Sequence, residues 1–283
     1  MYNKAYGIIE TLAPLHVGAS AGEETGNLNL IFRDQFTQTG IIPGSSIRGR
    51  FRADMRPIPG QNQEDQTQED RSGEWYGQEA KKGESDTTTE SKVKFEYASL
   101  LWLPVFCPGH PVVWVTCERW LRRYQKTVGA HIEDFPSEIP APYTASKQIQ
   151  GRKVGNGQRI LFFNLGFLTV TPTDDLDKWI PAGTEVDKNN LAVVGNNDIA
   201  MIHDMSLYRQ SRVRLNPNEK KVDGGGFFGV EAIPEGSVLV FPIAIKKSGW
   251  QPFKDQSKSE ELYFGGLESI GFGRCKVSLG GEL

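Results

Sequence analysis

The sequence predicts an α+β protein, because segments with strand periodicity and segments with helix periodicity are mixed in both halves of the chain. The chain has 283 residues, of which 38% are hydrophobic, and this is enough to build a core in one large domain or two small ones. The formal net charge is -3, so the protein as a whole does not attract nucleic acid. Any RNA site must therefore be local.

Two further features exclude whole classes of protein. No stretch approaches the roughly 20 consecutive apolar residues that span a bilayer, and the N-terminal residues lack the basic-then-apolar pattern of a signal peptide. We therefore expect a cytoplasmic protein that does not bind membranes. The three cysteines, Cys107, Cys117 and Cys275, are too far apart for a zinc or redox motif, so we expect buried free thiols and no metal held by them.

Strands are predicted wherever β-formers alternate or cluster between turn residues. Residues 3–15 form the first, with Tyr6, Ile8 and Ile9 as strand formers, and a loop follows over 18–26. Residues 27–34 alternate, which places Leu28, Leu30 and Phe32 on one side and Ile31 on the other. Further strands are predicted at residues 98–106, 112–116, 159–171, 237–245 and 275–279, and helices at 45–52, 118–124 and 174–179.

Residues 60–95 form a polar insertion in this pattern. Between residues 61 and 91 the chain is mostly Gln, Glu, Asp, Lys, Ser and Thr, and it has almost no apolar periodicity. We therefore expect a disordered or flexible segment, within which Trp75 and Tyr76 offer a contact point.

The segment from Pro43 to Arg52 has the composition of a phosphate-binding helix start. Ile47 and Phe51, four residues apart, predict a buried face, and the hydroxyls of Ser45 and Ser46 are able to cap the helix. Backbone N–H groups and hydroxyls at such an end also suit a phosphate, and arginines one turn further in can reach neighbouring phosphates. An ordinary capped helix with a solvated basic face fits the same residues.

A projecting hairpin is predicted over about residues 205–232. Arg212 and Arg214 alternate along one strand, a turn follows at 216–218, and a second strand carries Gly224 to Phe228. Such a basic finger could insert beside nucleic acid, although a plain surface hairpin fits as well. Near the C-terminus, the dense glycines of 264–274 allow close approach of the backbone to another backbone or to a phosphate.

In order and spacing, these segments resemble the RAMP superfamily of CRISPR proteins, and specifically the repeated backbone subunit of the type III-B (Cmr) effector complex. The matching motifs are His16-Val17-Gly18, the pair Arg33-Asp34, Pro43 to Gly49, Trp114 to Cys117, and Gly265 to Arg274. The agreement covers nearly the whole chain except the insertion.

The resemblance implies a single RAMP domain over 1–283 with a ferredoxin-like (RRM-like βαββαβ) core and a β-hairpin thumb. It also implies that copies of the chain stack along a CRISPR guide RNA, together with target RNA and other Cmr-type subunits, and that each thumb kinks the guide–target duplex. The residues implied in RNA binding are His16, Ser45, Ser46, Arg48, Arg50, Arg52, Arg212, Arg214, Gly271, Gly273 and Arg274.

The family pattern breaks at its catalytic position. Relatives that cut target RNA use an aspartate six residues ahead of the acid of the arginine-acid pair, and that position here is Leu28. Its neighbours Asn27 and Asn29 can hydrogen-bond but cannot take a proton or hold a metal as a carboxylate does. Glu23 and Glu24, in the same loop, are the candidates to replace the aspartate, with Mg²⁺ or another divalent ion as cofactor if cleavage is retained.

Two other functions remain open from the sequence. A stand-alone RNA-processing nuclease of the same superfamily would need a catalytic constellation, but His110, His131 and His203 fall in unrelated segments. A protein-interaction module without RNA binding would use the glycine-rich tail and the acidic insertion to hold partner proteins.

Overall fold

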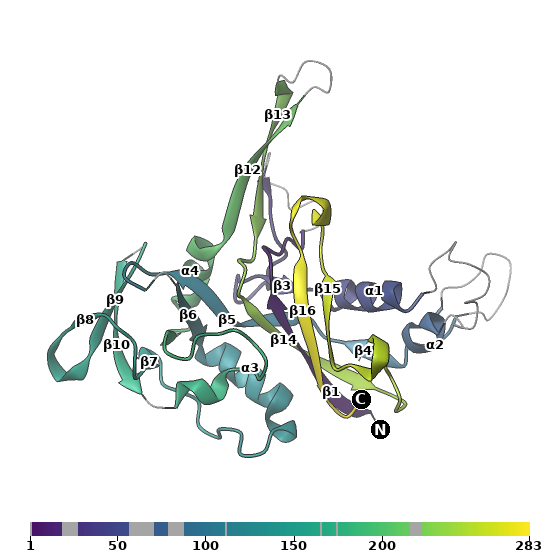
Figure 1. Cartoon of the computed structure of the whole chain (residues 1–283), viewed down its shortest axis with the longest axis horizontal. Helices are drawn as coiled ribbons and strands as arrows, with labels where there is room; N and C mark the ends of the chain where they lie inside the picture. The colour runs from purple at the N-terminus through teal and green to yellow at the C-terminus, as the bar shows by residue number, and fades with distance from the viewer. Residues whose placement is uncertain are drawn as a thin grey trace.

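The computed structural model describes residues 2–18, 28–56, 71–78, 88–110, 112–164, 166–173, 175–215 and 222–283, with the backbone alone for 214–215 and 222–226. Over these residues the fold is a mixed α+β arrangement, as the sequence predicts, with one large sheet and few helices (Figure 1). None of the helices is long and apolar enough to cross a membrane.

The large sheet runs in the order β15-β16-β1-β14-β5-β6-β11-β7-β10-β9-β8, with β3 paired to β5 and β4 to β14. Its strands are β1 (Asn3–Thr11), β3 (Ile41–Ile42), β4 (Val93–Phe95), β5 (Ala98–Phe106), β6 (Val112–Cys117), β7 (Thr144–Ser146), β8 (Arg152–Lys153), β9 (Arg159–Phe163), β10 (Gly166–Thr173), β11 (Leu191–Val194), β14 (Val238–Ile245), β15 (Ser259–Tyr263) and β16 (Arg274–Gly281). The strands predicted at 98–106 and 112–116 are present as β5 and β6, which pair antiparallel, and the strand predicted over 159–171 is two antiparallel strands, β9 and β10.

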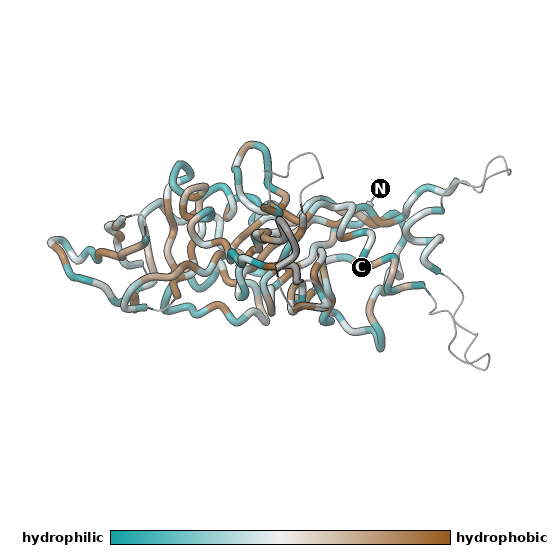
Figure 2. The backbone as a smooth tube through the Cα atoms, turned by 90° about the horizontal axis from the view of Figure 1, so that it is seen from above, coloured by the Kyte–Doolittle hydropathy of each residue, from teal (hydrophilic) through white to brown (hydrophobic). Residues whose placement is uncertain are grey.

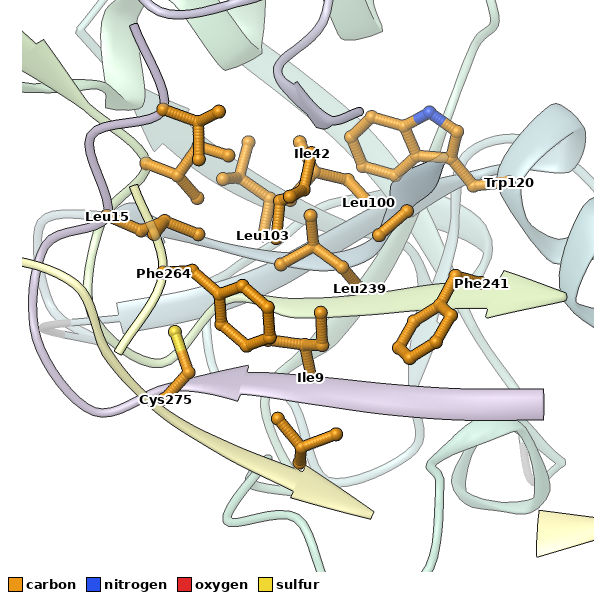
Figure 3. Close-up of a cluster of buried hydrophobic side chains, with 14 of the residues drawn as sticks. Ile9, Leu15, Ile42, Leu100, Leu103, Trp120, Leu239, Phe241, Phe264 and Cys275 are labelled. Atoms are coloured by element: carbon orange, nitrogen blue, oxygen red, sulfur yellow. The ribbon is translucent and has the colours of Figure 1, made fainter. Parts of the chain in front are cut away.

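The centre of the sheet is buried on both faces. Successive side chains of a strand point to opposite faces, so Ile8 and Ile9 of β1 enter two different hydrophobic clusters. Ile9 shares its cluster with Phe51 of α1 (Gly44–Asp54), and Ile8 shares the other with Leu121 of α3 (Glu118–Val128). Figure 3 shows Ile9 of the first cluster beside Leu239, Phe241 and Phe264. In Figure 2, hydrophobic positions gather along the middle of the molecule.

The predicted thumb hairpin is present and stands out from the body of the protein (Figure 1). Its strands are β12 (Tyr208–Leu215) and β13 (Val222–Ala232), and β2 (Leu28–Asn29) adds a third, parallel strand to β13. Helix α4 (Ile199–Ser206), which the sequence analysis did not predict, leads directly into β12. The predicted turn at 216–218 lies outside the described residues.

The predicted polar insertion contains part of the core. Helix α2 (Ser72–Tyr76) buries Trp75 and Tyr76, and the Trp250 Nε1–H donates to the Tyr76 hydroxyl over 3.0 Å. Residues 93–95 join the sheet as β4. The expectation of a flexible segment is therefore wrong for these residues, because two large aromatic rings supply a buried face without any periodic pattern. Residues 57–70 and 79–87 lie outside the described part of the chain.

The predicted strand over 27–34 is wrong in its extent and in its buried face. Within the described residues 28–34, only Leu28 and Asn29 form a strand, and isolated bridges pair Gly18 with Ile31 and Arg33 with Gly40. Ile31 is the residue that enters the core, whereas Leu28, Leu30 and Phe32 are half-buried. The alternation fails because the segment changes its pairing partner along its length. Leu28 and Asn29 pair with β13, Ile31 pairs with Gly18, and Arg33 pairs with Gly40.

Two smaller predictions also change. The predicted helix at 174–179 is a short 3-10 turn, Leu176–Trp179. The ferredoxin-like βαββαβ arrangement is not confirmed. α1 does connect β1 to β5, but the chain between β14 and β16 carries β15 and two 3-10 turns, Lys254–Gln256 and Glu268–Ile270, instead of a second helix.

Candidate nucleic-acid interface

The glycine-rich loop packs beneath the base of the hairpin. Phe272 is buried against Val230 and Ala232 of β13, and the Tyr208 ring of β12 meets it edge-on, with ring centroids 5.9 Å apart. Gly271 and Gly273, on either side of Phe272, have φ angles of 93° and 87°, a left-handed backbone that glycine adopts without strain. The two glycines therefore turn the ring into the protein, so that the loop supports the hairpin.

His16 joins the same assembly from the end of the first predicted strand. Its Nδ1 lies 2.7 Å from the backbone oxygen of Glu231, which makes Nδ1 the donor. Its own carbonyl accepts from the N–H of Gly266 over 3.0 Å, and the carbonyl of Pro14 accepts from Gly273 over 2.9 Å. Three of the predicted segments thus meet here. His16 itself is mostly buried and acts as a link between them.

Four charged side chains fix the hairpin base to the body. Arg33 reaches Asp204 of α4 over 3.0 Å and Glu231 of β13 over 3.1 Å, and Arg209 of β12 reaches the same two carboxylates, each over 3.1 Å. Burial by itself would raise the pKa of Asp204, but its hydrogen bonds and ion pairs with the two arginines outweigh burial and lower that pKa. Through Arg33 and Arg209, the buried carboxylate of Glu231 is linked to the segment after β2, to β12 and to α4.

His203 lies beside this cluster and carries no charge. Its side chain is fully buried, and its Nε2 accepts a hydrogen bond from the Gly40 N–H over 2.9 Å. Burial, helped by the nearby charge of Arg33, lowers the pKa of His203 to about 3. The ring is therefore neutral at pH 7, with its proton on Nδ1.

Helix α1 has an uncapped N-terminus that is open to an anion. The predicted serine cap is wrong: Pro43 occupies the N-cap position, no side chain caps the helix, and its first turn has no acid. Ser45, in that turn, is exposed, and the first N–H groups of a helix have no intrahelical acceptor. The N–H groups of Ser46 and Ile47 donate to the Pro43 carbonyl over 2.9 and 3.2 Å, which leaves those of Gly44 and Ser45 as donors that an anion could bind.

The arginines of α1 already have partners within the chain. Arg48 donates to the backbone oxygen of Tyr76, and the Arg50 Nε donates to Asp54 over 2.8 Å. This bond raises the pKa of Arg50, and the charge of Glu268 in the glycine-rich loop raises it further. Arg52 also interacts within the chain. A phosphate would have to compete for these guanidinium groups.

The hairpin exposes an apolar pair as well as the predicted arginine. Val213 and Phe227 lie opposite each other in the ladder, and the Phe227 side chain is 61% exposed. The Arg212 guanidinium lies 5.6 Å from the centre of the Phe228 ring. The side chain of Arg214 lies outside the described residues. The sequence analysis did not single out Phe227, although its place after three glycines sets it apart.

The remaining predicted residues are only partly brought together. Arg274 begins β16 and lies 3.8 Å from Glu261, with its side chain about half exposed. Asn29 pairs with Val230 in the ladder, and Leu28 packs against Gly229, where an added Cβ would lie 2.7 Å from its Cδ1. Glu23, Glu24 and Asn27 lie outside the described residues, and within the described ranges no group of three or more His, Cys, Asp or Glu could hold a metal ion.

The ionic cluster was invisible in the sequence. Arg33 is 171 residues from Asp204 and 198 residues from Glu231. Only the pairing of the hairpin with the segment after β2 brings these charges together, and no local pattern signals such a contact. Of the arginine-acid motif, only Arg33 belongs to the ionic cluster. Asp34 instead accepts hydrogen bonds from the N–H groups of Phe36 and Thr37 in its own turn.

Comparison with known families identifies the class. The family model of the RAMP superfamily matches residues 8–276, so this chain belongs to the RAMP superfamily. The resemblance drawn from the motifs is thereby confirmed.

Individual proteins of known identity are similar to this chain in sequence and in fold. The chain is 24% identical over 298 aligned positions to the CRISPR system Cmr endoribonuclease Cmr4 of Pyrococcus furiosus, covering 98% of this chain and 96% of that protein. Its fold matches the crystal structure of oligomeric Cmr4 from Pyrococcus furiosus with a TM-score of 0.65 at 18% identity over 100% of both chains. It also matches a chain of the type III-B Cmr-beta complex bound to cognate target RNA, with a TM-score of 0.68 at 17% identity over 98% of this chain and 96% of that chain.

Proposed function

We propose that this chain is a backbone subunit of a type III-B CRISPR effector complex, in which it binds the phosphates of the guide RNA and organises the guide–target duplex. The observation that carries the proposal is the junction of His16, the glycine-rich loop and the hairpin base in a chain that belongs to the RAMP superfamily. The proposal includes copies of the chain, other Cmr-type subunits and target RNA as partners, and a cytoplasmic location. The oligomeric Cmr4 and the RNA-bound Cmr-beta complex among its structural relatives support these partners.

The hairpin has the chemistry to displace a base. Phe227 and Val213 form an exposed apolar pair, and such a pair can take the place of a stacked base. The rigid base beneath it, held by Glu231 and Phe272, keeps this pair at a fixed position on each copy. The open N-terminus of α1 offers backbone N–H groups to a phosphate, which is recognition without base readout.

The hairpin is tested with Phe227→Ala in the complex assembled with guide RNA. Stacking is worth about 1–3 kcal/mol per base, so we expect roughly tenfold weaker binding of labelled, guide-matched target RNA. The matched control is Phe167→Ala on β10, because Phe167 is 64% exposed but lies outside the hairpin. Equal effects of the two changes would refute the role of the hairpin. Failure of the complex to bind RNA at low salt would favour the protein-interaction module.

For catalysis, we propose a scaffold that holds target RNA without cutting it at the usual position. That position holds Leu28, a side chain without acid–base or metal chemistry that packs on Gly229. The assembled complex is incubated with guide-matched labelled RNA and Mg²⁺, alongside a Leu28→Asp variant. Cuts only in the variant are the expected result. Regularly spaced cuts by the unchanged chain would instead indicate that Glu23 or Glu24, with a divalent ion, carries out the cleavage.

A further inference from the structure

A basic groove lies beside α3, at the opposite end of the molecule from the tip of the hairpin (Figure 1). It has a volume of about 670 Å³ and runs between α3 and the ends of β1, β4 and β14. Small and apolar residues contribute much of its lining: Ala5, Phe95, Pro242, Ile243 and Ala244. Its charged lining residues are the acid Glu96 and six bases, Lys4, Lys94, Arg119, Arg122, Arg123 and Lys126.

The bases of α3 form a stripe along one face of the helix. Positions 119, 122, 123 and 126 are three or four residues apart and therefore adjacent on the helix surface. The buried residues of the helix, among them Leu121 and Tyr124, pack on the sheet instead. Of the stripe, Arg123 stacks on the Tyr97 ring at 4.1 Å, whereas Arg119, Arg122 and Lys126 are exposed.

Three of the six cations pair with a carboxylate of this chain. Lys94 pairs with Glu90 over 2.8 Å, Arg122 pairs with Glu118 and Arg123 with Glu96. Within the part of the chain that the structure describes, the side chains of Lys4, Arg119 and Lys126 form no ion pair. Like charges around one groove repel each other, so an acidic occupant would remove an unfavourable interaction.

The lining of the groove favours a polypeptide over RNA. Single-stranded RNA stacks its bases on exposed aromatic rings, but the one ring in the lining, Phe95, is already stacked on Phe51 at 5.4 Å. An apolar floor with a basic rim suits carboxylates that alternate with small apolar side chains.

We propose that this groove docks an acidic polypeptide segment of a neighbouring subunit. The carboxylates of the segment would pair with Arg119, Lys126 and Lys4, and its apolar side chains would cover Pro242 and Ala244. That the segment belongs to a neighbouring subunit rests on the proposed function, whereas the groove shares no residue with the proposed RNA interface.

The test is the fluorescence anisotropy of a labelled ten-residue peptide of alternating Glu and Ala, with a labelled ten-nucleotide oligouridine measured in parallel. The full chain is compared with the double variant Arg119→Glu/Lys126→Glu. A second double variant, Arg152→Glu/Lys153→Glu on the exposed strand β8, changes the net charge equally and is the matched control. Thermal melting verifies that both variants are folded.

We expect the groove variant to bind the peptide at least tenfold more weakly, the control variant to stay within twofold, and oligouridine binding to be the same for both. Equal weakening of peptide binding by the two variants would reduce the effect to net charge and overturn the proposal. Absence of peptide binding to the unchanged chain would overturn it as well. A selective loss of oligouridine binding in the groove variant would make the groove an RNA site instead.

Discussion

Glu231 is a charged side chain inside the protein, since only 3% of it is exposed. A buried carboxylate is tolerated when opposite charges and hydrogen bonds replace its water shell. Arg33 and Arg209 do this from two different elements, and both are partly exposed. The ion pairs therefore matter less for net stability than for fixing one orientation of the hairpin.

Replacing Glu231 with Gln should lower the free energy of unfolding by about 2 kcal/mol. Breaking a fully buried ion pair costs about 3–5 kcal/mol, and the partial exposure of the two arginines reduces that figure. Urea unfolding measures the change. Glu261→Gln is the control, because Glu261 is 59% exposed and 3.8 Å from Arg274, and it should change the free energy by less than about 0.5 kcal/mol. Similar losses in the two variants would contradict the buried role of Glu231.

His203 should make the protein less stable in mild acid. Its pKa falls from its ordinary value of 6.5 to about 3 on folding, so below pH 6.5 the unfolded chain binds a proton that the folded chain does not. The stabilising effect is complete above pH 6.5 and is lost as the pH falls towards 3, by up to about 1.4 kcal/mol per pH unit. Urea unfolding at pH 7.5 and 5 should show a smaller loss for His203→Gln than for the unchanged chain. Parallel losses would show that other groups dominate.

At the scale of elements, the glycine-rich loop acts as a support for the hairpin. The loop turns Phe272 under β13, and its backbone holds the segment from Pro14 to His16. A motif whose composition suggests contact with phosphate therefore has a first role in packing. Close approach of backbone to backbone is the reason for at least one of its glycines.

Gly271 and Gly273 both have a left-handed backbone, but only Gly273 lacks room for a Cβ. Replacing each with alanine therefore separates the cost of backbone strain from the cost of a steric clash. Gly271→Ala adds a Cβ in open space, so it should cost only the left-handed strain of about 1–2 kcal/mol. In Gly273→Ala the new Cβ would also lie 2.4 Å from the backbone oxygen of Phe264, so the loss should be at least twice as large. Thermal unfolding of both variants measures the difference. Equal losses would mean that the loop shifts to accommodate the methyl group.

For the whole molecule, Trp75 should contribute to stability like a core residue although it lies in a polar stretch of sequence. It is buried in the larger hydrophobic cluster together with Tyr76. Trp75→Ala should therefore lower the free energy of unfolding by about 3–5 kcal/mol, as for other large core truncations. Phe36→Ala is the control, since Phe36 is 87% exposed and its loss should be nearly neutral. A small effect of Trp75→Ala would mean that α2 is detachable from the core.

The sequence predicts those parts of the fold that local chemistry determines. Apolar runs predict the strands β5 and β6, alternation and turn residues predict the β12–β13 hairpin, and the spacing of Ile47 and Phe51 predicts α1. The strands β7 and β15 are missed because they are short and mostly polar, and β11 and α4 are missed because short apolar runs have no period that separates a strand from a helix. The motifs mark segments of the candidate interface, but the ion pairs among these segments depend on contacts between residues far apart in the sequence.

The placement of β1 also affects how the protein folds during synthesis. Its two neighbours in the sheet, β14 and β16, lie more than two hundred residues later in the chain. At about 5–20 residues per second, a ribosome takes roughly 10 to 50 seconds to make the intervening segment. Throughout that time the apolar residues of β1 have no partner strands, so the nascent chain depends on chaperones or on temporary contacts to avoid aggregation until the last strands emerge.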